Sequence, residues 1–215
     1  MKRYETATRT TLPRRTYTVI RLDGRAFHTY LKRVEKPYDN RFGENMKVVA
    51  SYLAAEIAGT VLAYTQSDEI SLVLQDFEKE GTQPWFGGEV QKMVSVSASL
   101  ATVKLDRVRH REPLATFDSR VFTLPSRDEV LAYLGWRRGD AVRNSVSMAA
   151  QSVFSHKELH GKSQTDMLEL LRSRGIEWDE YPGHFKFGSL VSLSIETDTV
   201  RFHDGRTGEW RTTEA

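Results

Sequence analysis

Two short acidic motifs carry the side chains of this chain that are best suited to chemistry. The first is Arg-Leu-Asp-Gly-Arg-Ala-Phe-His at residues 21–28, where Asp23 ends a strand-like run. The second is Gln-Ser-Asp-Glu at residues 66–69, where Asp68 and Glu69 lie between two strand-like runs. Carboxylates about 4 Å apart repel by about 4 kcal/mol at an effective dielectric near 20, and a bound divalent cation removes that penalty. If the motifs meet in space, they predict a two-metal centre that handles nucleoside triphosphates.

The residues after the first acid are suited to binding a triphosphate. Gly24 has no side chain, so a metal or phosphate can approach its backbone closely. The backbone amides from Arg25 to His28 could form an anion-binding nest. Arg25, His28 and Lys36 are candidate countercharges, although His28 alone could be a structural histidine and Lys36 alone a surface lysine.

The surrounding elements predict how the two motifs could meet. Strand-like runs and helical patterns follow one another in the order strand, helix, strand, strand, helix, strand. The expected strands are residues 17–22, 61–66, 70–75 and 117–124. One expected helix begins after a cap at Asp39 or Asn40 and ends at Gly59, and the other covers 89–105. This is the ferredoxin-like β-α-β-β-α-β order of an α+β fold, in which the first strand lies beside the central hairpin. Asp23 would then face Asp68 and Glu69.

The first expected helix has one apolar face. Its apolar residues recur every three or four positions, at Phe42, Met46, Val49, Leu53 and Ile57. Beyond the sheet we expect a helical extension and a small β-hairpin. The expected elements are helices at 126–133, at about 137–154 and after a cap at Ser163, and strands at 190–195 and 199–202 with a turn at 204–205. Residues 1–125 are expected to form a palm-like catalytic domain, and 126–215 an extension packed as part of the same unit.

Composition narrows the class of protein. The 215 residues are 39% hydrophobic and 28% charged, which indicates a globular chain. The formal charge of +2 does not by itself indicate nucleic acid, but residues 107–111 form a basic run that is either an RNA contact or a solvated loop. With no cysteine, disulfides, thiolate catalysis and cysteine-ligated zinc are excluded. The beginning of the chain has no apolar stretch and no run is long enough for a membrane span, so we expect a cytoplasmic protein.

These motifs resemble those of the tRNA-His guanylyltransferase superfamily, and specifically of its guanylyltransferase-like branch of 3′-to-5′ nucleotide polymerases. The matching segments are residues 21–28, 36–39, 63–69, 117–121 and 133–137. The resemblance implies a polymerase-palm fold, in agreement with the order of elements above. It also implies that Asp23, the Gly24 carbonyl and Asp68 hold two Mg²⁺ ions, for which Mn²⁺ could substitute.

The resemblance implies further roles in the same site. Glu69 is also needed there, and Lys36 serves the activation step. The nucleotide-binding residues would be Gly24, Arg25, Ala26, Phe27, His28 and Ser67, with Lys92 of the second helix reaching a second triphosphate. The implied reaction first activates the 5′-phosphate of a tRNA with ATP or GTP. The 3′-hydroxyl of an incoming nucleotide then attacks the activated phosphate. The resemblance also implies a homotetramer.

One segment differs from the family motif and bears on which RNA is the substrate. Where eukaryotic members carry His-Ile-Asn-Asn, residues 142–145 are Val-Arg-Asn-Ser, and only Asn144 matches. This favours template-dependent repair of 5′-truncated tRNA over untemplated addition of G to tRNA-His. The expected RNA contacts are Arg143, Asn144, His156 and Lys157, although the segment 156–163 could equally be a helix-capping loop.

Two other functions stay open at this point. A palm-type nucleotide cyclase would also place acids at a strand end and a hairpin, but the context of residues 23–28 and 36–37 argues against it. A non-catalytic RNA-binding module would have no use for unpaired carboxylates that face an RNA phosphate.

Overall fold

An antiparallel sheet forms the centre of the protein in a computed structural model that describes residues 1–110, 113–192 and 199–214. Its strands are β1 (Tyr17–Gly24), β2 (Thr60–Gln66), β3 (Glu69–Gln75), β4 (Phe117–Leu124) and β5 (Ser189–Ser192). They lie in the order β4-β1-β3-β2-β5. The expected α+β arrangement is confirmed, because β1 lies directly beside the β2–β3 hairpin. β5 adds an edge strand next to β2.

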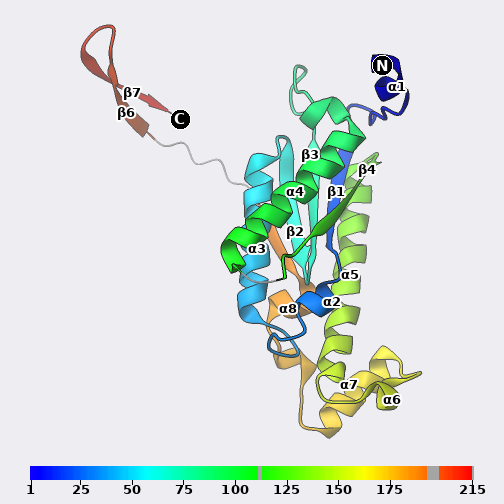
Figure 1. Cartoon of the computed structure of the whole chain (residues 1–215). Helices are drawn as coiled ribbons and strands as arrows, with labels where there is room; N and C mark the ends of the chain where they lie inside the picture. Colours follow the sequence, from blue (N-terminus) through cyan, green and yellow to red (C-terminus); the bar gives the residue numbers. More distant parts are fainter. Residues whose placement is uncertain (111–112, 193–198, 215) are drawn as a thin grey trace.

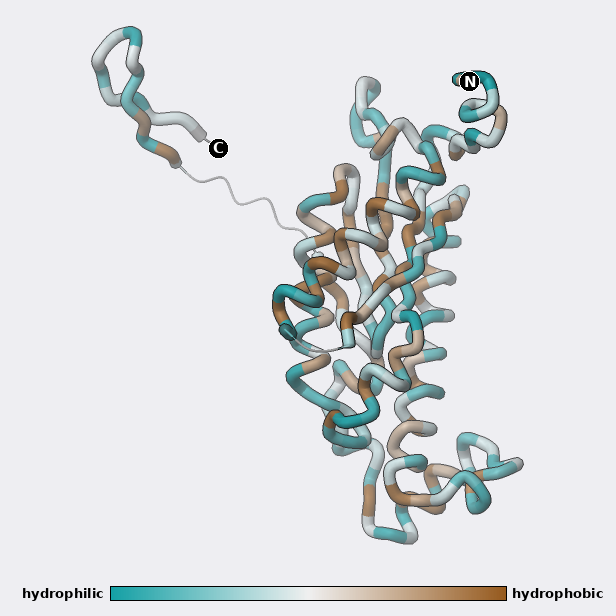
Figure 2. Tube along the Cα trace, viewed as in Figure 1, coloured by the Kyte–Doolittle hydropathy of each residue, from teal (hydrophilic) through white to brown (hydrophobic). Residues whose placement is uncertain are grey.

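Two helices cover one face of the sheet, α3 (Asn40–Glu56) and α4 (Val90–Arg109) (Figure 1). The predicted apolar stripe of α3 is buried, and Asp39 caps the helix by accepting a hydrogen bond from the Phe42 amide at 2.9 Å. The stripe packs on alternate strand residues of the same core, which are Ile20, Leu22, Ile70, Leu72 and Leu74. The apolar segments of these layers are the brown stretches of the tube in Figure 2. α4 continues four residues past its expected end at 105.

Near the acidic motifs the opposite face of the sheet carries polar side chains, since successive side chains of a strand point to opposite faces. Asp23 and Glu69 are direct partners in the β1–β3 register, and Ser71 follows on the same face of β3. The long helix α5 (Arg127–Gln151) covers this face, where Tyr133 and Arg137 hydrogen bond to Ser71 and Glu69. The sheet therefore separates an apolar core from a polar layer that contains the acidic motifs.

The prediction of two helices at 126–133 and 137–154 is wrong, because the single helix α5 spans this region. Gly135 in a helix interior costs about 1 kcal/mol relative to alanine, which weakens a helix without ending it. The buried Arg137, two residues later, ties the middle of the helix to the sheet. The expected cap at Ser126 is confirmed, since its side chain accepts a hydrogen bond from the Glu129 amide at 3.2 Å.

The short helices that follow α5 pack on its far end. The small apolar cluster there joins α5 to α6 (His156–Leu159) and α7 (Gln164–Ser173), the latter with the expected cap at Ser163. The remaining elements are α1 (Lys2–Ala7), α2 (Phe27–Tyr30), η1 (Trp85–Gly88), η2 (Trp178–Glu180), α8 (Gly183–Phe187), β6 (Thr199–Asp204) and β7 (Glu209–Glu214). β6 and β7 form the expected hairpin. The end of the strand expected at 190–195 lies outside the described residues.

No helix in the described part of the chain combines the length and the apolarity that a membrane span requires. The boundary between a palm-like domain and an extension at 125/126 stays a prediction.

Candidate active site

The register of β1 and β3 brings the two acidic motifs together. Asp23 and Glu69 are opposite each other, and Asp68 lies in the two-residue turn that joins β2 to β3. Ser67, the first residue of that turn, has a left-handed φ of 49°. A positive φ at this position lets a two-residue hairpin turn follow the twist of its strands. The meeting of the motifs that the strand order predicted is therefore present in the structure.

The surroundings of Asp68 disfavour its ionised form. Burial, together with the negative charges of Asp23 and Glu69, raises the pKa of Asp68 to about 6, although hydrogen bonds from the backbone amide of Asp68 and from Ser67 oppose the rise. Among the described residues, no salt bridge joins Asp68 or Asp23 to a basic side chain. Two carboxylates in this situation attract a cation from outside the protein.

Glu69, the next residue, has its own cation inside the protein. Arg137 donates two hydrogen bonds to the Glu69 carboxylate, from Nε to Oε1 at 2.8 Å and from Nη2 to Oε2 at 2.6 Å. Both residues are buried, with 5% of Arg137 and 8% of Glu69 exposed. Burial raises the pKa of Glu69, and the hydrogen bonds and charge of Arg137 oppose that rise. A metal ion at Glu69 would have to compete with this guanidinium.

The ion pair is the centre of a larger polar network under the sheet. Arg137 also bonds to Asp140 at 2.8 Å, and Asp140 in turn binds the exposed Arg143 at 2.8 Å. On the other side, the Ser71 and Tyr133 hydroxyls are 2.7 Å apart. The sequence alone assigned no role to Tyr133, Arg137 or Asp140. Their spacing of four and three residues, which puts them on one helix face, is the signal that could have found them.

The donors present fit a magnesium ion that takes its other ligands from substrate. Asp23, Asp68 and the Gly24 carbonyl supply hard oxygen atoms, and magnesium commonly binds one or two carboxylates together with water and substrate phosphates. Among the described residues there is no group of three or more His, Asp or Glu side chains that could hold a metal ion. The third nearby acid, Glu69, is already paired.

The expected triphosphate cradle at 24–28 is smaller than predicted. The Arg25 amide donates to the Thr116 carbonyl at 2.8 Å, so this amide is engaged. The glycine at position 24 has a packing cause, because a Cβ there would lie 2.4 Å from the Phe27 ring. Ala26 has a left-handed φ of 56° and precedes the short helix α2, whose first amides have no acceptor within the helix. His28 is exposed on α2.

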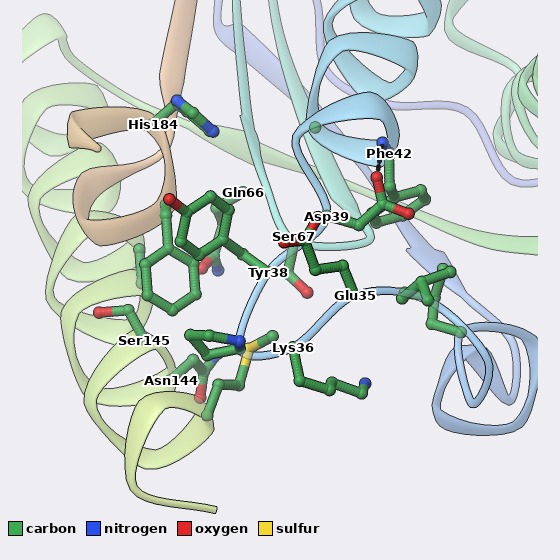
Figure 3. A pocket seen from close by; sticks show the side chains of 17 residues that line it. Glu35, Lys36, Tyr38, Asp39, Phe42, Gln66, Ser67, Asn144, Ser145 and His184 are labelled. Atoms are coloured by element: carbon green, nitrogen blue, oxygen red, sulfur yellow. Dashed lines mark hydrogen bonds between the residues drawn. The ribbon is translucent and has the colours of Figure 1, made fainter. Parts of the chain in front are cut away.

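A cavity opens beside the acidic turn (Figure 3). Gln66 and Ser67 form one wall, Asn144 and Ser145 of α5 another, and the remaining lining includes Lys36, Tyr38, Asp39, His184 and Phe185. Tyr38 stacks on Phe185 with ring centroids 4.8 Å apart. An apolar, aromatic wall with a few polar groups is typical of small-molecule sites, including those for a nucleoside. Ser67, Lys36 and Asn144 thus lie around one cavity. Tyr38 belongs to the matching segment 36–39 but had no assigned role, and the sequence gave no signal for His184.

Four predicted residues lie elsewhere. Lys92 is exposed in the first turn of α4, 3.8 Å from Glu89. This turn adjoins the end of the sheet where Tyr17 pairs with Gln75, opposite to the acids. His156 and Lys157 are exposed on α6. Arg143 is exposed and paired with Asp140. Within one chain, the structure does not bring these four side chains to the acids, and their roles stay predictions.

Comparisons with known proteins agree with this geometry. Residues 1–125 match the family model described as Thg1, tRNAHis guanylyltransferase. The tRNA(His) guanylyltransferase of Kluyveromyces lactis is 30% identical over 204 residues, which cover 84% of each chain. A solved bacterial tRNA(His) guanylyltransferase (Thg1)-like protein in complex with ATP is 44% identical with a TM-score of 0.86, over 89% of this chain and 86% of that chain. A second one, in complex with GTP, is 39% identical with a TM-score of 0.79, over 100% of this chain and 88% of that chain.

Proposed function

This chain belongs to the tRNAHis guanylyltransferase (Thg1) family and is a nucleotidyltransferase, and from that premise we propose that it extends the 5′ end of tRNA with the acids of β1 and the β2–β3 turn. The observation that carries the proposal is the uncompensated pair Asp23 and Asp68, which adjoins a cavity suited to a nucleoside. The two similar solved structures contain ATP and GTP. We propose that this chain uses both nucleotides.

The proposed chemistry has two displacements at phosphorus. An oxygen of the tRNA 5′-monophosphate attacks the α-phosphate of ATP or GTP, and pyrophosphate leaves. The 3′-hydroxyl of the incoming nucleotide then attacks the activated 5′-phosphate, and the nucleoside monophosphate leaves. Positioning and neutralisation of charge supply the catalysis, since phosphoryl transfer needs little covalent help from a protein.

The residues have distinct tasks in these steps. Asp23, Asp68 and the Gly24 carbonyl would hold Mg²⁺, as two ions for which Mn²⁺ can substitute, and the bound metal would neutralise charge on the phosphates. Lys36, at the rim of the cavity, would stabilise charge on the phosphate that is activated. Ser67 and the first amides of α2 would orient the triphosphate. Glu69 would act indirectly, by fixing the turn to α5 through Arg137.

We propose 5′-truncated tRNA as the substrate, with nucleotides added against a template. The support is the stretch 142–145, where only Asn144 matches the motif of the enzymes that add G to tRNA-His. Both Asn144 and Ser145 line the cavity, and the buried Ser145 also has a packing role, because it accepts a hydrogen bond from the Trp178 indole at 3.1 Å. A cytoplasmic homotetramer is the assembly we propose on the basis of the family resemblance.

The experiment combines the protein with Mg²⁺, ATP, labelled GTP and a tRNA that lacks its first 5′ nucleotide. We expect 5′ extension by the wild type and by Glu169→Ala, an exposed acid on α7, and none by Asp68→Ala. Comparison with full-length tRNA-His separates repair from addition of G. Cyclic nucleotide without extension would show a cyclase, and RNA binding without metal-dependent turnover would show a non-catalytic module; either result contradicts the proposal.

A further inference from the structure

A second cavity, of about 380 Å³, borders the candidate active site. It shares Val34, Glu35 and Asp39 with the cavity at Ser67 and extends from them to the end of α4. Its volume falls within the range of about 300–1,000 Å³ that is typical of ligand sites. The proposed chemistry at Asp23 and Asp68 makes no use of it.

The lining of this cavity is rich in cationic groups. Arg33, Arg41, Arg109 and His110 line it, against the two carboxylates of Glu35 and Asp39. One oxygen of Asp39 is already engaged as the cap of α3. Among the described residues, no salt bridge involves any of the three arginines. None of the three guanidinium groups therefore forms an ion pair with these or other acids of the described chain, and the three arginines outnumber the two carboxylates of the lining.

Arg109 is the least expected of these side chains. Its guanidinium lies over the rings of Phe42 and Tyr30, at 5.1 and 5.6 Å from their centroids. Its Nε and Nη1 atoms are buried and have no hydrogen-bond partner among the described residues. A buried, unpaired polar group costs free energy, and the ring contacts offset only part of that cost. An anion bound in the cavity would compensate the remaining charge.

The start of α3 adds a further favourable contribution. This helix of 17 residues begins at Asn40, and Arg41 and Asn45 of its first two turns line the cavity. The N-terminal end of a helix carries a partial positive charge and exposed backbone amides, both of which favour anions. At the same end the Asp39 carboxylate caps the helix, so Arg33, Arg41 and Arg109 supply the main positive charge of the cavity.

We propose that this cavity binds a phosphate group of the substrate, either from the tRNA backbone near its 5′ end or from a nucleoside triphosphate. The choice of these two sources rests on the proposed function, because the cavity adjoins the site where both would meet. Arginine is suited to either, since its planar guanidinium matches phosphate oxygens.

The test removes charge from the rim without disturbing the core. The double variant R33Q/R41Q changes two exposed arginines of the cavity, and K32Q/K79Q is the matched control, because Lys32 and Lys79 are exposed and do not line it. Kd values for 5′-truncated tRNA and for GTP are measured over a range of salt concentrations. We expect R33Q/R41Q to weaken one of the two ligands about tenfold.

The two sources give different results. If the phosphate belongs to RNA, tRNA affinity falls, its salt dependence decreases by about one for each lost contact, and GTP affinity is unchanged. If it belongs to the nucleotide, only GTP affinity falls. Unchanged binding of both ligands relative to K32Q/K79Q overturns the proposal, even when 5′ extension by the wild type is intact.

A second measurement is independent of the proposed function. Inorganic tripolyphosphate should raise the Tm of the wild type and of K32Q/K79Q, and raise that of R33Q/R41Q much less. An equal shift in all three proteins contradicts a phosphate site in this cavity. If the wild type does not extend tRNA but this difference is seen, the proposed function fails and the phosphate site stands.

Discussion

Asp68 and Glu69 are adjacent in the chain and meet opposite electrostatic environments. Asp68 lies in the β2–β3 turn beside Asp23, and burial raises its pKa to about 6. Glu69 is the first residue of β3 and is gripped by Arg137 from α5. One acid thus has no cation within the described residues, and the other has its own. From this difference we propose that the two acids of one motif have different tasks: Asp68 binds a metal ion, while Glu69 holds the turn in place.

The largest effect is expected for Asp68→Asn on catalysis. Loss of one of the two free carboxylates should lower kcat/KM for 5′ extension roughly 1,000-fold, because the charge that binds the cation is lost. The measurement is single-turnover extension of 5′-truncated tRNA at saturating Mg²⁺. Glu169→Gln serves as the control with an unchanged rate. A decrease of less than tenfold for Asp68→Asn would place the metal site elsewhere.

The next effect tests the paired acid. Arg137→Met leaves Glu69 buried without a cation and should lower the free energy of unfolding by about 3 kcal/mol. The double variant E69Q/R137M should recover much of that loss, because no charge is then left unpaired. Urea denaturation of the two single variants and the double variant measures the coupling. Arg143→Met, which removes only an exposed partner of Asp140, should cost less than about 1 kcal/mol. Additive losses in the cycle would show that the pair is not coupled.

A smaller effect concerns pH and the free acid. The pKa of Asp68 is raised from 3.8 to about 6, so the folded state holds its proton more tightly than the unfolded state. The metal-free wild type should therefore lose about 2 kcal/mol of stability as pH rises from about 4 through 6. Asp68→Asn removes this loss and should be more stable than the wild type at pH 7.5 but not at pH 4. Thermal unfolding at both pH values with a chelator measures it, and Mg²⁺ with GTP should abolish the advantage of the variant. Equal pH profiles for the two proteins would contradict the raised pKa.

The smallest effect tests the edge of the polar network. Tyr133→Phe removes the partner of the buried Ser71 hydroxyl, 2.7 Å away, and should cost about 1 kcal/mol. Tyr4→Phe, at an exposed tyrosine of α1, should leave stability unchanged. Chemical denaturation compares them. A neutral Tyr133→Phe would mean that the hydrogen bond adds nothing to the attachment of α5.

The order of the palm strands was predictable from the sequence because each strand and helix has its own local pattern. The stripe from Phe42 to Ile57 and the paired runs around Ser67 depend only on near neighbours in the chain. The continuity of α5 was not predictable in this way. Its middle is held by a contact between Arg137 and Glu69, which are 68 positions apart, and Gly135 gives a local signal that points the wrong way.

The candidate site shows the same division. The meeting of Asp23 with Asp68 follows from strand order, and the sequence could predict it. The sequence could not predict that Glu69 is paired with a cation and Asp68 is not. Both are acids of one motif, and the partner Arg137 comes from α5, which is distant in the chain. The engaged Arg25 amide and the ring of Phe27 beside Gly24 are likewise tertiary contacts, and they are the reason why the expected cradle is smaller.

The most direct test of the division between the two acids is Mn²⁺ binding measured by electron paramagnetic resonance in the presence of GTP. The wild type, Asp68→Asn and Glu69→Gln are compared at a temperature where circular dichroism shows all three folded. We expect Asp68→Asn to lose tight Mn²⁺ binding and Glu69→Gln to retain it. Loss of Mn²⁺ in Glu69→Gln with retention in Asp68→Asn would contradict the account, because the paired acid would then be the metal ligand.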